Sequence, residues 1–433
     1  QRSARGLHVG TRLPTRARPW RPSCSTTQAS DAVIHCGECA RWRMALNEFA
    51  GTPSNCELDV LTYTAGIGEC EKGAQWQEAI CMLSGMRLRM LEPSARIYAA
   101  VIGACKKRGQ RQQAMGIFSE MFVCLVEPDA TTYNVAISAS GSCAHWHEAI
   151  GLASDMQLRR VEPDVVTCNA VISACAKGVA WQHAMRFVST AWSRRLGPNK
   201  RSFNAALSAC GRGAQWHQAV YLLSHMWTRC LGPDAFSYGL AVSACGKAAQ
   251  WHQAALMVAD MRLCKLDPDV ITYVGAITAC GSSAQWYAAL RMYWDMQLRR
   301  LELDVITYGA VVSACAKGVQ CREAMGIFST ICLRRLEPDV TSFGAAISAC
   351  EKEFEWSEAM RLVSDMRFRV LKPDVLVYSA VISAFEKGTR WHDAMGTFLD
   401  MRLRKLEPDE ITYNAIISAC EKRAQWHEAA VIV

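Results

Sequence analysis

The chain has 433 residues, of which 51% are hydrophobic and 20% are charged, a composition that suits a folded protein and excludes an extended disordered one. No apolar run approaches the roughly 18 residues of a membrane-spanning helix, so we expect no membrane partner. Of the net charge of +8, the six arginines in residues 1–30 contribute most, and the remaining chain is close to neutral. Any binding of nucleic acid by that remainder would therefore depend on where its charges lie.

Residues 1–30 are rich in Arg, Ser and Thr and contain no acidic residue. This composition is typical of a transit peptide and predicts a protein of the mitochondrion or chloroplast. A disordered basic tail or a mistranslated leader is the alternative interpretation. Residues 31–59 look like a degenerate copy of the repeat that follows, because Cys36, Trp42 and Ala45 match later repeat positions if one residue is inserted.

A repeat of 35 residues occupies the rest of the chain. Prolines mark it, with Leu303 in place of one of them, at Pro93, Pro128, Pro163, Pro198, Pro233, Pro268, Pro338, Pro373 and Pro408. We number repeat positions from the second residue after each proline, and the repeats from 1 to 11 in chain order. They begin at residues 60, 95, 130, 165, 200, 235, 270, 305, 340, 375 and 410, and the chain ends at position 24 of repeat 11. A fixed period of this size is typical of a solenoid.

Each repeat is predicted to form two helices. Positions 1–13, "VVTCNAVISACAK" in repeat 4, form the first helix, positions 14–16 form a turn that often starts with Gly, and positions 17–31 form the second helix. The Pro-Asp pair at positions 34 and 35 separates the repeats, because proline cannot continue a helix and Asp is a good N-cap for the next one. The predicted fold class is therefore an all-α solenoid of helix–turn–helix repeats.

Two faces of the first helix differ in their residues. At 100° per residue, positions 4, 7, 8 and 11 share one face, and their aromatic, aliphatic and Cys side chains predict the core. Position 20 is Ala in all eleven repeats, which lets helices approach closely, and position 17 is Trp in nine. Positions 2, 5, 9 and 13 lie on the opposite face. Residues that vary between repeats concentrate there, so this face is the candidate binding surface.

The cysteines and the short motifs of the sequence do not predict a metal site or a catalytic site. Nine of the 21 cysteines occupy position 11 and are predicted to be small core residues, and free thiols at this density are typical of a reducing compartment. Cys36 and Cys39 form a lone CxxC, so we expect no metal site. The chain contains no nucleophile motif or phosphate loop, and we expect neither a cofactor nor catalysis within it. A catalytic domain beyond residue 433 is the alternative.

Three positions of the candidate surface carry distinctive residues. Position 13 is cationic in nine repeats, which suits phosphate contacts or, alternatively, a solvated helix end. These cations are Lys72, Lys107, Lys177, Arg212, Lys247, Lys317, Lys352, Lys387 and Lys422. The aliphatic residues at position 2 are Leu61, Val166, Ile271, Ile306, Leu376 and Ile411. Position 5 is Asn in four repeats, and because Asn is mildly unfavourable inside a helix, its recurrence favours a role in recognition.

This pattern resembles the pentatricopeptide repeat family over residues 60–433. The resemblance rests on the 35-residue period, the "TYN" or "SFN" start of the first helix, Ala at position 20, Met at position 27 and the closing Pro-Asp. Tetratricopeptide repeats have 34 residues and different signature positions. Since every unit has one length, the chain looks like the pure (P-type) class of the family. The resemblance implies a right-handed α-α superhelix whose first helices line a concave groove.

The resemblance also implies sequence-specific binding of single-stranded RNA, with one base read per repeat by positions 5 and 35. Position 2 side chains of adjacent repeats would sandwich the base, and position 13 cations would approach the phosphates. The implied readers are Thr64 with Ser94, Asn134 with Asp164, Asn169 with Asn199, Asn204 with Asp234 and Ser379 with Asp409, and Asn414 alone. By similarity to the family, the three Asn pairs favour U, a pyrimidine and U, and the Ser379 pair favours a purine. Position 35 is weaker evidence, because Asp, Asn and Ser are also preferred N-caps.

Five repeats depart from the family at position 5. Their residues, which carry no hydrogen-bonding side chain, are Ala99, Gly239, Val274, Gly309 and Gly344. These repeats are expected to space the bound strand or to bind it weakly. The implied function is binding of an organellar transcript in RNA processing, stabilisation or maturation, alongside other RNA-processing proteins. The alternatives are a tetratricopeptide-like protein scaffold and the RNA-binding part of a longer RNA-processing enzyme.

Overall fold

The computed structural model describes residues 60–422, and within this range all regular structure is helical. The transit-like segment 1–30, the degenerate repeat at 31–59 with its CxxC, and positions 14–24 of repeat 11 lie outside the described residues. The helices of the described range keep the predicted phase, one first and one second helix per repeat. The all-α solenoid of paired helices predicted from the sequence is confirmed.

The first helices begin at the predicted repeat starts. They are α3 (Val60–Lys72), α5 (Ala95–Lys107), α7 (Ala130–Ser142), α9 (Val165–Lys177), α11 (Lys200–Arg212), α13 (Ala235–Lys247), α15 (Val270–Ser282), α17 (Val305–Lys317), α19 (Val340–Lys352), α21 (Val375–Lys387) and α23 (Glu410–Glu421). The second helices begin at position 17. They are α4 (Trp76–Leu88), α6 (Arg111–Val123), α8 (Trp146–Leu158), α10 (Trp181–Ser193), α12 (Trp216–Thr228), α14 (Trp251–Leu263), α16 (Trp286–Leu298), α18 (Cys321–Leu333), α20 (Trp356–Phe368) and α22 (Trp391–Leu403).

The second helices end at position 29, two residues earlier than the sequence predicts. In repeat 4, α10 ends at Ser193, and Arg195 follows with a left-handed φ of 57°. The amide of Leu196 donates to the Ala191 carbonyl at 3.0 Å, and the amide of Arg195 donates to the Trp192 carbonyl at 3.0 Å. This Schellman motif satisfies the last carbonyls of the helix. The helix is therefore ended by its own backbone cap, before the chain reaches proline.

The glycine that often starts the turn between the two helices has a role other than backbone freedom. Gly178 has a φ of −86°, whereas the left-handed residue of the turn is the next one, Val179, with a φ of 60°. A Cβ at Gly178 would lie 2.2 Å from Cδ1 of Trp146, which comes from the preceding repeat. Gly at position 14 therefore makes room for the Trp at position 17 of its neighbour.

Position 35 caps the first helix of the next repeat. The side chains of Asp164, Asn199 and Asp234 accept a hydrogen bond from the position 3 amide at 2.7, 3.2 and 2.9 Å. The same cap is made by Asp129, Asp269, Asp304, Asp339, Asp374 and Asp409. Ser94 makes no such bond. Capping thus accounts for the acidic residues at position 35, and any contact with a base would be an additional role.

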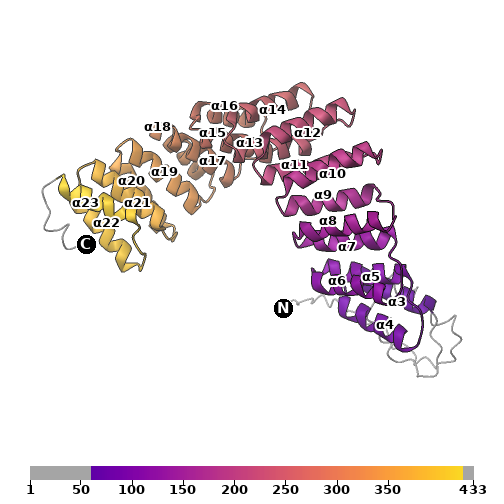
Figure 1. Cartoon of the computed structure of the whole chain (residues 1–433). Coiled ribbons are helices and arrows are strands. Elements are labelled where there is room, and N and C mark those ends of the chain that lie inside the picture. The colour runs from indigo at the N-terminus through magenta and orange to yellow at the C-terminus, as the bar shows by residue number, and fades with distance from the viewer. Residues whose placement is uncertain (1–59, 423–433) are drawn as a thin grey trace, which may run out of the picture. The chain divides into compact units, whose positions relative to one another are not determined.

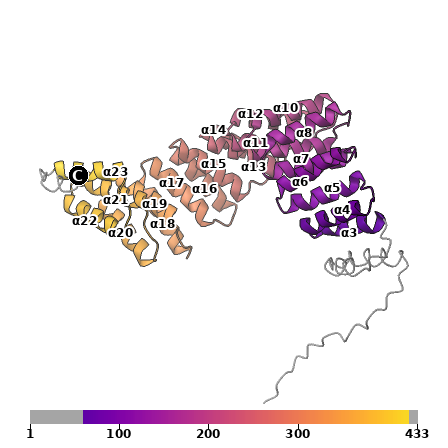
Figure 2. The ribbon, with the colours of Figure 1, turned by 60° about the horizontal axis from the view of Figure 1, so that its bottom comes forward.

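The chain divides into two compact units, residues 1–139 and 140–433. In the second unit, each first helix packs on the next first helix, as α11 does on α13, and on the second helix of its own repeat. Successive second helices, such as α10 and α12, make no close backbone contact among the described residues. The repeats of this unit are therefore closest together along their first helices, and the helix pairs follow one another as a stack (Figures 1 and 2).

The predicted core positions are buried. Phe203, Tyr273 and Tyr308 at position 4 are 0% exposed, and the alanines at position 20 of the described repeats are at most 1% exposed. Burial raises the pKa of the position 11 thiols Cys175 and Cys210 to about 12, so they stay protonated and behave as small apolar side chains. Residues 60–422 contain no group of His, Cys, Asp and Glu that could hold a metal ion. None of the described helices is long and apolar enough to cross a membrane.

Candidate functional site

The aliphatic residues predicted at position 2 project from the first helices into solvent. Their exposed fractions lie between 58% and 78% for Leu61, Val166, Ile271, Ile306, Leu376 and Ile411. Phe236 occupies the same position in repeat 6 and is 65% exposed, although the sequence analysis did not single it out. Large apolar side chains are thus displayed at a regular interval on the face opposite the core, where flat apolar groups such as bases could pack.

A groove of about 610 Å³ runs along the first helices of repeats 8 to 11. Leu376 and Ile411 line it from position 2, and Gly309, Gly344 and Ser379 line it from position 5. The position 9 serines of repeats 8 to 10 and Glu351 at position 12 also line it. The stripe predicted as a binding surface therefore lines a groove in this region. Glycine at position 5 leaves it open, because no side chain fills the space between neighbouring helices.

In repeats 4 and 5, positions 5 and 35 are joined by a hydroxyl. Asn169 is half-buried, and its Oδ1 accepts a hydrogen bond from Ser202 Oγ at 2.5 Å. Asn199 Oδ1 accepts from the same hydroxyl at 3.3 Å. The arrangement recurs one repeat later, where Ser237 Oγ donates to Asn204 Oδ1 at 2.6 Å and to Asp234 Oδ1 at 2.8 Å. The structure thus brings together both members of these two predicted pairs.

The other predicted readers differ in their surroundings. Ser379 is only 7% exposed and donates its hydroxyl to the Leu376 carbonyl at 3.0 Å, and Thr64 donates to the Val60 carbonyl at 2.7 Å. Both hydroxyls are therefore engaged with their own helices. Asn134 is half-buried on α7 and Asp164 caps α9, and the two residues belong to different units. Asn414 is exposed on α23. Base reading by these residues stays a prediction.

The sequence analysis missed the position 3 hydroxyls. Position 3 is Ser or Thr in nine of the eleven repeats, and those side chains are at most 2% exposed. From repeat 3 onward, each of these hydroxyls donates to the N-cap side chain before it. In repeats 5 and 6 it also donates to the Asn of the preceding repeat. The recurrence of a small hydroxyl next to the aromatic core position was the available signal. It had no obvious meaning until the packing of successive first helices was known.

Most position 13 cations reach back to the preceding repeat. Lys107, Arg212 and Lys352 donate to backbone carbonyls at the end of the preceding first helix, at 2.8, 3.4 and 2.9 Å. Lys387 and Lys422 instead pair with the position 12 carboxylates of Glu351 and Glu386, at 3.0 and 2.9 Å. Lys72 pairs with Glu69 of its own helix. Within residues 60–422, Lys177, Lys247 and Lys317 have no ion-pair partner, so they are the cations most available to a phosphate.

The carboxylate of Glu386 is firmly charged. Burial alone would raise its pKa, but hydrogen bonds from Lys422 and Ser418 and the charge of Lys387 outweigh that effect and hold the pKa below its usual value. Ser418 Oγ and Lys422 Nζ lie 2.8 and 2.9 Å from the same Oε1 atom. A permanent negative charge thus lies beside the position 13 cations of repeats 10 and 11.

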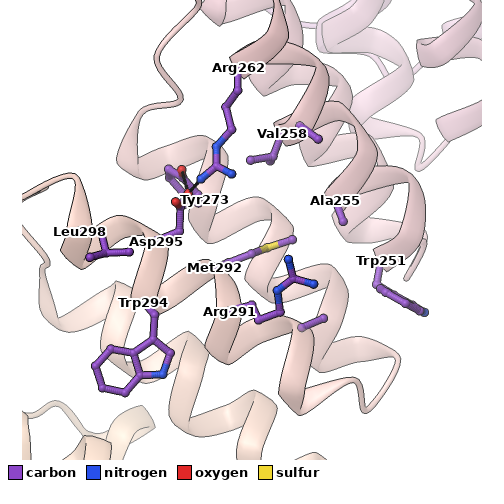
Figure 3. Close-up of a pocket in the computed structure, with 12 residues that line it drawn as sticks. Trp251, Ala255, Val258, Arg262, Tyr273, Arg291, Met292, Trp294, Asp295 and Leu298 are labelled. Carbon is purple, nitrogen blue, oxygen red and sulfur yellow. Dashed lines mark hydrogen bonds and ion pairs between the residues drawn. The ribbon is translucent and has the colours of Figure 1, made fainter.

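A second cavity, of about 410 Å³, lies between the second helices α14 and α16. Arg262 and Tyr273 point at Asp295 there, and both contact its carboxylate (Figure 3). Arg367, Tyr378 and Asp400 repeat the same contacts between repeats 9 and 10. Because the trio recurs and joins adjacent repeats, we assign it to packing between repeats. It contains no residue of positions 2, 5 or 13.

Family models match four stretches of the chain. The model described as the PPR repeat family matches residues 128–177 and 373–422. The model described as the pentatricopeptide repeat domain matches residues 81–142 and 291–353. No curated protein sequence matches the chain.

Several solved structures are similar to the chain. The pentatricopeptide repeat protein PPR10 from maize is 21% identical with a TM-score of 0.61, over 96% of this chain and 64% of that one. PPR10 in complex with an 18-nt psaJ RNA element is 20% identical with a TM-score of 0.47, over the same shares. The PPR domain of Arabidopsis thaliana protein-only RNase P 1 in complex with tRNA is 12% identical with a TM-score of 0.38, over 42% of this chain and 95% of that one.

This chain therefore spans 64% of the length of PPR10, and the likeness between the two structures shows a shared fold. The family models, the unbroken 35-residue phase of the helices and this fold agree with one another. The stretches that the models match, residues 81–177, 291–353 and 373–422, are therefore pentatricopeptide repeats.

Proposed function

We propose that the chain binds single-stranded RNA along its first helices, with positions 5 and 35 selecting one base per repeat. The observation that carries the proposal is the pair of clusters in repeats 4 and 5, where Asn169 and Asn199, and then Asn204 and Asp234, meet at one hydroxyl. Amide and carboxylate groups held side by side are suited to the hydrogen-bonding edge of an unpaired base.

Neighbouring residues supply the other contacts that a single strand needs. Val166 and Phe236, at position 2 of repeats 4 and 6, are exposed and can press on the faces of bases. Lys177 and Lys247 have no ion-pair partner within residues 60–422 and can follow the phosphates. Affinity is then expected to fall with rising salt, because each phosphate contact releases counterions.

We further propose that the chain is of the P-type class and acts on an organellar transcript. Its mechanism would be steric, because a strand covered by repeats is hidden from nucleases and held out of hairpins. Processing, stabilisation and maturation of RNA are the functions that such occupancy can serve. A protein-binding scaffold remains the alternative, and it predicts that binding does not depend on Asn169 and Asn204.

Selection from a random pool of single-stranded RNA tests the proposal. We expect enrichment of a U–pyrimidine–U core, which the Asn134, Asn169 and Asn204 pairs favour by similarity to the family. The double variant Asn169→Ala with Asn204→Ala should then bind the selected RNA at least about 30-fold more weakly, because each of the two lost base contacts costs roughly 1–3 kcal/mol.

The matched control is Thr64→Ala with Ser379→Ala, which also changes two position 5 residues. Their hydroxyls already donate to their own helices, so the loss in affinity should stay below about threefold. If no RNA is enriched at moderate salt, the RNA-binding proposal is wrong and the scaffold alternative gains support. If both double variants bind the selected RNA equally well, base reading by Asn169 and Asn204 is wrong.

A further inference from the structure

The position 3 hydroxyl of one repeat lies against the position 5 side chain of the repeat before it. We propose that Ser202 and Ser237 are positioning residues that fix the side-chain amides of Asn169 and Asn204 for contact with a base. The inference rests on the proposed function and assigns specificity to residues outside positions 2, 5, 13 and 35. Ser202 and Ser237 would themselves touch no base, because both are 0% exposed.

The direction of the hydrogen bonds at Ser202 follows from counting its one proton. The backbone amide of Asn199 donates to Ser202 Oγ at 3.2 Å, which occupies a lone pair of the hydroxyl. The hydroxyl proton is then free for an acceptor. Asn169 Oδ1 lies at 2.5 Å and Asn199 Oδ1 at 3.3 Å, so the shorter bond to Asn169 takes the proton.

This bond decides which end of the Asn169 amide meets a ligand. With Oδ1 held by Ser202, the two Nδ2 hydrogens are the part of the amide left for another partner. The half-buried Asn169 side chain would therefore act as a donor toward a carbonyl oxygen or an unprotonated ring nitrogen of a base. An amide with no such restraint can rotate and present either end, which lowers its ability to discriminate.

Burial makes the restraint strong. Ser202 and Ser237 lie between first helices, so water cannot replace the bond that they give, and hydrogen bonds in such surroundings are stronger than in water. Ser237 has a competing acceptor, the Asp234 carboxylate at 2.8 Å, beside Asn204 Oδ1 at 2.6 Å. A charged acceptor draws the proton more strongly than a neutral one. The restraint is therefore expected to be firmer on Asn169 than on Asn204.

Repeats with Gly at position 5 provide a natural comparison. Ser342 donates to the capping Asp339 at 2.6 Å, as Ser237 does to Asp234, but its neighbour in the preceding repeat is Gly309. A Cβ built on Gly309 would lie 3.0 Å from Ser342 Oγ, so the hydroxyl occupies the same place next to position 5. Here it has an N-cap to hold and no amide to orient. Ser342 thus has the structural role without the positioning role.

The test compares Ser202→Ala and Ser342→Ala in the full chain. For each protein, the dissociation constants of four RNAs are measured that differ only in the base assigned to repeat 4. Ser202→Ala should lower the ratio between the worst and the best base by about fivefold, the worth of one hydrogen bond, while Ser342→Ala leaves that ratio unchanged. Ser202→Thr keeps a hydroxyl, as Thr167 does in repeat 4, and should restore the ratio.

The outcomes separate the two proposals. If the wild-type chain binds no RNA, or binds all four RNAs equally, the proposed function fails. If the wild-type chain discriminates and Ser202→Ala discriminates as well, only the positioning role is overturned. Ser237→Ala with RNAs varied at the repeat 5 base provides a second site, where a smaller fall in the ratio is expected. If Ser342→Ala and Ser202→Ala lower the ratio between the worst and the best base equally, the position 3 hydroxyl has only a capping role.

Discussion

Repeats 4 and 5 differ from repeats 9 and 10 on the same face of the same scaffold. In repeats 4 and 5, position 5 is Asn and position 12 is Ala176 or Gly211. In repeats 9 and 10, position 5 is Gly344 or the buried Ser379, and position 12 is Glu. One region displays restrained amides beside cations that lack a carboxylate partner. The other has an open groove beside Lys387 and Lys422, which are already paired with its glutamates.

The difference lies in two positions and leaves the fold unchanged. Glu351 pairs with Lys387 at 3.0 Å and also accepts from Ser383 Oγ at 2.8 Å, so position 12 of one repeat binds positions 9 and 13 of the next. Ala or Gly at position 12 leaves the cation for an external partner. We therefore expect base selection and phosphate binding to be concentrated in the region of repeats 4 and 5, with repeats 9 and 10 tolerating many sequences.

Removing cations should give the largest difference between the regions. Lys177→Ala with Arg212→Ala is expected to weaken binding of the selected RNA about tenfold at low salt and to lower the slope of log affinity against log salt by roughly 1.4, because two phosphate contacts on a single strand are lost. Lys387→Ala with Lys422→Ala should lower affinity only about threefold, since these lysines are paired with Glu351 and Glu386 and their loss removes no phosphate contact but leaves the two carboxylates uncompensated. Fluorescence anisotropy over a salt series measures both. Equal losses of affinity for the two double variants would show that the two regions do not differ in phosphate binding.

Releasing the paired lysines should make repeats 9 and 10 behave more like repeats 4 and 5. Glu351→Gln with Glu386→Gln keeps an oxygen that can accept from Ser383 and Ser418, but removes both negative charges. We expect affinity for RNA to rise about threefold and its salt dependence to become steeper.

The control for this gain is Glu358→Gln on the second helix α20, where Glu358 pairs with Arg361 away from the groove. It removes one charge of the same kind and should leave the affinity nearly unchanged. An equal rise in affinity for this variant would mean that net charge matters and that the position of the charge does not.

The sequence predicted the fold well because a 35-residue period repeats each amphipathic pattern ten times. The core at positions 4, 7, 8 and 11, the exposed position 2 and the caps at position 35 all follow from helix geometry alone. The pairing of Lys387 with Glu351 could not be predicted, because it joins residues 36 apart through the packing of two first helices. Ser379 lines the groove, but its hydroxyl donates to a carbonyl of its own helix, a local bond that the sequence did not predict.

The two regions should also respond differently to acid through their N-caps. Partial burial alone would raise the pKa of Asp339, but hydrogen bonds from Ser342 and Thr341 outweigh it and hold the pKa below the usual value. Because the folded pKa is the lower one, this cap stabilises the protein above the unfolded pKa, and its contribution is lost as the pH falls through the folded value. Asn199 makes the same cap without a titrating group.

Exchanging the two caps tests this reasoning. Asp339→Asn should reduce the fall in the urea midpoint between pH 6 and pH 3, and Asn199→Asp should enlarge it, while both variants stay close to wild type at pH 6. The expected changes are small, because the caps are largely exposed and screened by solvent. A fall that is identical in all three proteins would show that acid acts on groups other than the caps.

The smallest effect should be common to both regions, since it belongs to the scaffold. Position 15 is left-handed in repeats 1 to 10, with φ of 55° at Ala249 and 64° at Phe354. A non-glycine side chain in this conformation destabilises the folded state by roughly 1–2 kcal/mol. Glycine removes that strain but costs about 0.4–1 kcal/mol through its greater freedom in the unfolded chain. Ala249→Gly and Phe354→Gly should therefore each raise the free energy of unfolding by about 0.5–1 kcal/mol, measured by urea unfolding. The adjacent Ala248, with a φ of −88°, offers the matched control, because Ala248→Gly gains no relief from strain and should destabilise. A gain at Ala249 in repeat 6 without one at Phe354 in repeat 9 would mean that the backbone strain at position 15 varies along the array.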